Sequence, residues 1–106
     1  ALSHVLNFPN PFVGNENTVF MFDHNRTGDD LDIQVQIFTT TGKLVKTLET
    51  TSYVSEAHIE PAELTLNGRD EYNDVLAKGV YIYKVTVRSL RDGAKATKFE
   101  KLVMLK

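Results

Sequence analysis

The sequence predicts an all-β fold, a single antiparallel β-sandwich, on three observations. Apolar and polar residues alternate with period two in several segments, as they do in strands that bury one face. No stretch keeps the apolar repeat of about 3.6 residues that marks a helix, and the nearest candidate, 55–66, is interrupted by Pro61. Turn-forming residues separate the alternating segments, and a chain of 106 residues is the usual size for one core. We therefore expect one domain spanning 1–106.

Three segments predict strands most clearly. Segment 31–37 separates its apolar residues cleanly from its polar ones. Segment 18–22 is apolar on both faces, as expected of a strand covered on two sides or of one that keeps a face for a partner. Segment 79–87 is rich in β-branched and aromatic residues, and we interpret its alternating apolar face as core. That face carries Tyr81, Tyr83, Val85 and Val87.

Weaker patterns predict four more strands, at 4–8, 43–49, 58–66 and 95–105, which gives about seven in all, a number typical of a sandwich. Gly42 closes the turn 39–42, and Asp92 with Gly93 forms the kind of pair that suits a tight hairpin. We expect both turns to link antiparallel neighbours. Gly79 is interpreted as a backbone position that needs no Cβ, such as a bulge that opens a strand.

Composition excludes several classes of function. The formal net charge of −2 offers no attraction for nucleic acid or for an anionic membrane. The absence of cysteine excludes disulfides, thiolate zinc sites and cysteine nucleophiles within this segment. No apolar run approaches the roughly 20 residues of a membrane-spanning helix, and a signal peptide, if the parent is exported, is expected upstream of Ala1.

Catalytic and metal-binding patterns are weak. The chain has no Gly-x-Ser-x-Gly elbow and no His-Glu-x-x-His helix, and Ser3 and His4 would point to opposite faces of a strand. We therefore predict no enzyme activity and no cofactor. The loops with Asp29, Asp30 and Asp32 and with Asp70, Asn73 and Asp74 suggest calcium as an alternative, but turn chemistry already accounts for these residues and no metal site is predicted. His4, His24 and His58 are scattered along the sequence and are interpreted as surface or strand-edge residues.

Four blocks of sequence occur in a characteristic order. The first, 7–12, holds Pro9 and Pro11, which stiffen the chain; the second, 37–45, turns at Gly42. A polar loop after 66–70 then leads to Gly79 and Tyr81 in 76–83, and the chain closes on an apolar strand with lysines, 101–106. In this order the blocks resemble the type A C-terminal sorting domain of the type IX secretion system of Bacteroidetes and the related immunoglobulin-like domain of the flagellar hook-capping protein. Leu66 departs from the tryptophan that many members carry, and the hairpin 89–98 is longer and more polar.

The resemblance implies an immunoglobulin-like β-sandwich that is recognised by the outer-membrane translocon once the cargo has reached the periplasm. In many relatives a cell-surface sortase then removes the domain and joins the cargo to lipopolysaccharide. The implied partners are thus the outer-membrane components of the system, the sortase and an N-terminal parent domain, and the implied location is the cell surface or outer membrane. The last block is also similar to the ends of gingipain-like peptidases and of the sortase, which implies a cysteine peptidase as the parent.

We place the recognition function on the terminal strand, as a hypothesis. If that strand lies at or beside a sheet edge, its unpaired backbone groups and lysines offer a surface for strand addition. The residues are Lys101, Leu102, Val103, Leu105 and Lys106, while Pro9, Pro11, Gly42, Gly79 and Tyr81 are interpreted as fold motifs. The alternatives are an ordinary last strand, a structural module beside a peptidase or in flagellar hook assembly, and a carbohydrate- or calcium-binding accessory domain.

Overall fold

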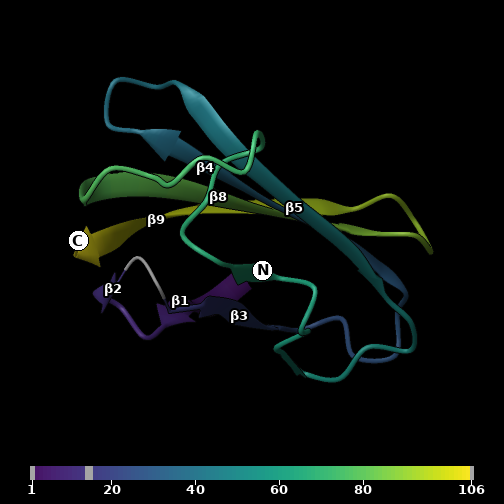
Figure 1. Ribbon diagram of the computed structural model, residues 1–106. Coiled ribbons are helices and arrows are strands. Elements are labelled where there is room, and N and C mark those ends of the chain that lie inside the picture. Colours follow the sequence, from purple (N-terminus) through teal and green to yellow (C-terminus); the bar gives the residue numbers. More distant parts are fainter. Residues whose placement is uncertain (1, 14–15, 106) are drawn as a thin grey trace.

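The computed structural model describes residues 2–13 and 16–105, and these residues form a β-sandwich without helices (Figure 1). The strands are β1 (Leu2–Phe8), β2 (Phe12–Val13), β3 (Thr18–His24), β4 (Leu31–Thr39), β5 (Leu44–Ser52), β6 (His58–Ile59), β7 (Thr65–Leu66), β8 (Gly79–Ser89) and β9 (Lys95–Leu105). The smaller sheet has the order β1-β3-β6, with β7 also paired to β3, and the larger has the order β2-β9-β8-β4-β5. The all-β sandwich is confirmed, but one pair, β2 with β9, is parallel.

The core lies between the two sheets. The predicted inner faces are correct: the alternating apolar residues of β4 over 31–37 and the alternating face of β8 with Tyr81, Tyr83, Val85 and Val87 are all buried. The smaller sheet contributes Phe20, whose ring meets the Tyr83 ring edge-on with centroids 4.7 Å apart. Such an arrangement favours the aromatic quadrupoles and adds to the area that both rings bury.

Strand β3 uses its two faces differently. Phe20 and Phe22 are fully buried inside the sandwich, whereas Met21 on the outer face is only half-buried. Beside it on β1, Leu6 is 43% exposed and Phe8 is 69% exposed. The strand that the sequence marks as apolar on both faces therefore has one face in the core and one on an outer apolar surface.

Two details differ from the sequence prediction. The single strand expected over 58–66 was wrong, because a turn closed by a hydrogen bond from Leu64 N to Pro61 O (3.0 Å) divides it into β6 and β7. Gly79 was interpreted as a backbone position that needs no Cβ, with a bulge as an example; no bulge occurs there, since Gly79 pairs in register with Met104. Its φ of +144° is a conformation that favours glycine, since an added Cβ is disfavoured there even with open space around it.

The connections that follow the long strands were predicted correctly. Gly42, with φ +94°, turns β4 into antiparallel β5, and Gly93, with φ +75°, turns β8 into antiparallel β9. At the start of β8, the Tyr81 hydroxyl donates to the Ala77 carbonyl. This contact is of the tyrosine-corner type that occurs in immunoglobulin-like sandwiches, where it fixes the chain as it enters a strand.

Candidate docking strand at the edge of the larger sheet

The structure divides the residues predicted for recognition into two groups. Leu102 is fully buried and belongs to the core, whereas Lys101 is exposed and Leu105 is 50% exposed. Val103, between them, is half-buried. Lys106 lies outside the described residues. The C-terminal part of β9 is therefore an integral part of the sandwich. A partner that binds it can contact only the exposed side of the strand.

The outer edge of β9 is closed at its C-terminal end. β2 pairs there with Met104 and Leu105 in parallel register. Just upstream, the side chain of Asn10 takes the place of a neighbouring strand: its amide nitrogen donates to Lys101 O (3.1 Å), and its amide oxygen accepts from Val103 N (3.0 Å). A carboxamide carries the same donor and acceptor as a peptide group, so this pair of bonds continues the ladder by one unit.

Asn10 is held in place by the proline-rich segment. It donates to the Asn7 side-chain oxygen (3.1 Å), Asn7 donates in turn to the Thr18 hydroxyl (2.9 Å), and Thr18 donates to Pro9 O (2.8 Å). The peptide bonds before Pro9 and Pro11 are both cis. The segment passes from the smaller sheet to the larger and ties β1 and β3 to β9. Sequence reasoning missed the asparagines; the only local signal is an Asn between two prolines.

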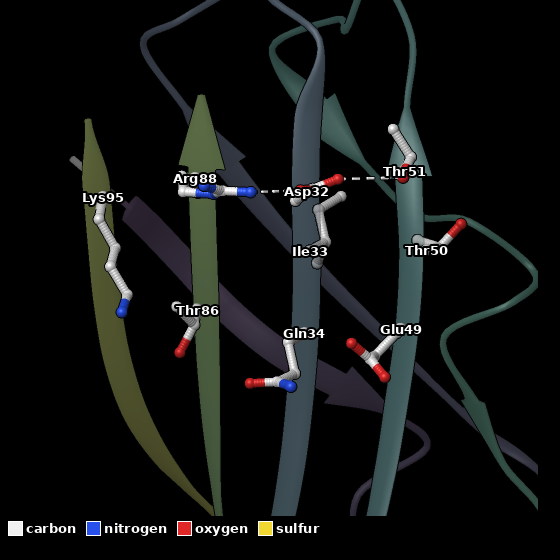
Figure 2. A pocket seen from close by; sticks show the side chains of 9 residues that line it. All are labelled: Asp32, Ile33, Gln34, Glu49, Thr50, Thr51, Thr86, Arg88 and Lys95. Atoms are coloured by element: carbon white, nitrogen blue, oxygen red, sulfur yellow. Dashed lines mark hydrogen bonds and ion pairs between the residues drawn. The ribbon is translucent and has the colours of Figure 1, made fainter. Parts of the chain in front are cut away.

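Over 95–100 the outer edge of β9 has no strand partner and is in this sense open, although β1 of the smaller sheet lies close to β9. Lys101 and Val103 direct backbone groups outward, and because this direction alternates along an antiparallel strand, Thr97 and Phe99 do so as well. Within the described chain no backbone hydrogen bond reaches those outward groups. Figure 2 shows β9 on the flank of the sheet with Lys95 extending from it.

The opposite edge of the same sheet, on β5, is partly covered. The backbone N of Glu71 donates to Val45 O (3.1 Å), and the Glu71 carboxylate accepts from Thr47 N (2.7 Å). A loop therefore blocks the first part of β5 much as Asn10 blocks the end of β9. Such coverings reduce the tendency of exposed edges to pair with other chains.

The outer face of the larger sheet forms a shallow polar hollow of about 540 Å³ (Figure 2). Asp32 is central to it, bonded to Arg88 (3.0 Å) and to the Thr51 hydroxyl (3.1 Å). Gln34, Glu49, Thr86 and Lys95 complete the wall. No aromatic side chain is among the residues that line the hollow, so the carbohydrate-binding alternative finds no support there.

The aspartates of the calcium alternative have partners within the protein. Asp29 is bonded to Arg91 (3.1 Å) and to the Ser89 hydroxyl (2.9 Å), and Asp30 accepts from Val54 N (2.8 Å). In the second loop, Asp70 accepts from two backbone N–H groups of its own turn. Over residues 2–13 and 16–105, no group of three or more acidic or histidine side chains is arranged to hold a metal ion. These residues serve as turn and ion-pair formers.

His4 and His58 are exposed, as the sequence interpretation expects, and although they are far apart in the sequence they meet at Asp23. His4 Nδ1 lies 2.9 Å from one oxygen of Asp23, and His58 Nδ1 lies 2.7 Å from the other, because β1 and β6 flank β3 at this point. The hydrogen bond with His58 lowers the pKa of Asp23, and bonds with Asp23 and Glu60 raise the pKa of His58. His24 was misassigned to the surface, since it is buried and contacts Glu56 O.

No family model matches the sequence, and no curated protein does. Among solved structures, the chain is similar to dimeric latent PorU from Porphyromonas gingivalis, with 31% identity, a TM-score of 0.77, and coverage of 95% of this chain and 9% of PorU. PorZ, an essential bacterial surface component of the type IX secretion system of Porphyromonas gingivalis, aligns with 19% identity, a TM-score of 0.48, and coverage of 97% and 12%. β-Glucuronidase from Bacteroides uniformis aligns with 12% identity, a TM-score of 0.50, and coverage of 95% and 13%.

These likenesses carry different weight. The β-glucuronidase match shows the fold alone, and the PorZ agreement is too low to support an argument. The PorU match extends over nearly all of this chain at an appreciable identity, although the chain spans only 9% of PorU. The chain is thus a small β-sandwich similar to a domain-sized part of PorU. No helix of the described residues is long and apolar enough to cross a membrane.

Proposed function

We propose that this chain is a non-catalytic C-terminal sorting domain of the type IX secretion system, which directs a parent protein across the outer membrane and to the cell surface. The observation that carries the proposal is the 31% identity to part of PorU over 95% of the chain, at a TM-score of 0.77. The order of the four sequence blocks supports it independently. Its partners are then the outer-membrane components of that system, the sortase and the domain that precedes it in the parent.

The position of β9 determines which residues of such a signal the translocon can contact. Leu102 and Met104 fill the core, so the terminal block is presented as one side of a folded strand rather than as a free peptide. Lys101 and Leu105 are the exposed members of the block. A translocon that recognises them recognises the sandwich as a folded unit.

The test is export of a folded reporter that carries a signal peptide at its N-terminus and residues 1–106 at its C-terminus. We expect surface display in a Bacteroidetes strain with its type IX translocon and retention in the periplasm without it. Lys101→Glu with Leu105→Asp should reduce display, because both side chains are exposed; Lys43→Glu with Leu44→Asp, on the exposed start of β5, is the matched control. Removing residues 102–106 is less informative, since it also removes two core residues.

A structural role beside a parent domain is the second candidate. It is favoured by the outer apolar face of the smaller sheet, where Leu6 and Phe8 of β1 lie across from Met21 and Val19 of β3. Under this alternative the reporter stays in the periplasm in both strains, and the native parent protects these side chains from solvent. Translocon-dependent display would instead support the sorting function.

A further inference from the structure

We propose that the open part of β9, residues 95–100, binds an extended acidic segment of a partner, which adds to the larger sheet as a further strand. The inference rests on the proposed function and specifies the chemistry of its docking contact. The proposed contact lies at residues 95–100, upstream of the block 101–106 in which the sequence analysis placed recognition. The reason is that Asn10 and β2 already occupy the edge from Lys101 onward.

The backbone geometry defines where the added strand fits. Thr97 and Phe99 direct their N–H and C=O groups away from β8, and Lys95 follows the same alternation. Strand addition uses such groups for affinity and uses alternate side chains for specificity. The Asn10 side chain blocks the edge at Lys101, so the incoming strand must end there. The site therefore accepts a short segment that lies beside residues 95–100, on the same side of β9 as β2.

The charge of the edge selects the partner. The stretch 95–101 of β9 carries three lysines, Lys95, Lys98 and Lys101, and one acidic residue, Glu100. These lysines form no salt bridge within residues 2–13 and 16–105. A second copy of the chain would bring like charges together across the new pair, which is unfavourable. A strand with acidic side chains would instead place opposite charges across the new pair, which is favourable. Charge complementarity therefore favours an acidic segment over self-pairing.

Phe99 supplies an apolar contact within this basic edge. Its ring is 57% exposed on the outer face, and Lys84 Nζ lies 5.8 Å from the ring centroid. An added strand that places an apolar side chain opposite Phe99 would cover the ring. Because residues two apart share a face, Phe99 lies on the same face as Lys95, whereas Lys98 lies on the other. The expected segment thus places an apolar side chain opposite Phe99 and acidic side chains opposite Lys95 and Lys98.

Thr97→Pro tests the backbone contact. It removes the outward N–H while leaving the ladder to β8 intact, as proline is tolerated on a strand edge. Glu49→Pro, at an outward position on the β5 edge, is the matched control. Lys95→Glu with Lys98→Glu tests the charge, and Lys43→Glu with Lys78→Glu, also exposed, changes the net charge equally. Circular dichroism and thermal unfolding establish that each variant is folded.

The probe is a synthetic peptide that carries Val at the position opposite Phe99 and Glu at the positions opposite Lys95 and Lys98, titrated into the isotope-labelled chain and followed by amide NMR shifts. We expect Thr97 and Phe99 to shift, with binding about tenfold weaker for Thr97→Pro and for the Lys95/Lys98 variant than for their controls. A peptide N-methylated at alternate amides should bind as weakly. Equal binding by the methylated peptide, no binding at all, or a dimer formed through this edge would overturn the inference.

Export of the reporter separates the two proposals. If the wild-type domain is displayed but the folded Thr97→Pro and Lys95/Lys98 variants are displayed equally well, the docking edge is wrong and the sorting function stands. If the wild-type domain is not displayed, the sorting function fails, and the peptide titration still decides whether the edge binds an acidic strand. Loss of display in both edge variants, with normal display of both controls, is the expected result.

Discussion

Asn10→Ala should destabilise the sandwich although its side chain lies on the surface. The amide makes three hydrogen bonds, to Lys101 O, Val103 N and the Asn7 side chain. Each such bond contributes about 0.5–1.5 kcal/mol, and because Asn10 is exposed we use the lower half of that range, which gives about 2 kcal/mol in all. For a domain of this size the loss corresponds to a melting temperature lower by about 8 °C.

Thermal unfolding followed by circular dichroism measures the total effect, and hydrogen exchange of the Val103 amide measures its local origin. That amide should exchange faster in the variant, since its acceptor is the Asn10 side chain. Asn67→Ala is the matched control, because Asn67 accepts one local bond from Arg69 N (3.1 Å), and its melting temperature should fall by no more than about 3 °C. A melting temperature for Asn10→Ala equal to that of the control, with unchanged exchange at Val103, would refute the capping role.

Three further predictions concern the core, the ionised cluster and one turn. Phe20→Ala should lower the free energy of unfolding by about 3–5 kcal/mol in urea titrations, because its ring is buried against Tyr83, whereas the exposed Phe99→Ala should have a much smaller effect. The ionised Asp23 stabilises the fold above its unfolded-state pKa of 3.8, and this contribution is lost as pH falls through its lowered folded-state pKa. The protonated His58 stabilises the fold below its unfolded-state pKa of 6.5, and this contribution is lost as pH rises through its raised folded-state pKa. The stability difference between wild type and Asp23→Asn should therefore be larger near about pH 5 than near about pH 9 or about pH 2, and a flat profile would contradict the cluster. Gly42→Ala should cost about 1 kcal/mol, since its φ of +94° strains any residue with a Cβ, and an unchanged denaturation midpoint would count against it.

Much of the fold could be predicted because alternation is a local property. The inner faces of β4 and β8 follow directly from residues spaced two apart. The errors arose where a strand is too short to show a period: β2 has two residues, and β6 and β7 have two each. Their positions depend on pairing with strands elsewhere in the chain, which no window of sequence contains.

The candidate site was predictable only in part, for the same reason. The terminal strand and its lysines are visible in the sequence, but which stretch of its edge is free depends on Asn10, 91 residues away from Lys101. The association of His4 with His58 likewise requires that both strands flank Asp23. Contacts of this kind are set by register between distant strands, and composition gives no indication of them.

The dependence of the sandwich on its last strand has a consequence for biosynthesis. Asn10 bonds to the backbone of β9, β2 pairs with β9, and Leu102 and Met104 complete the core. Contacts between such distant parts of a chain form late, since a long loop must close first. A nascent chain that stops short of these residues leaves β2 without its strand partner and the core incomplete. Folding of this module therefore cannot be completed until β9 has been synthesised.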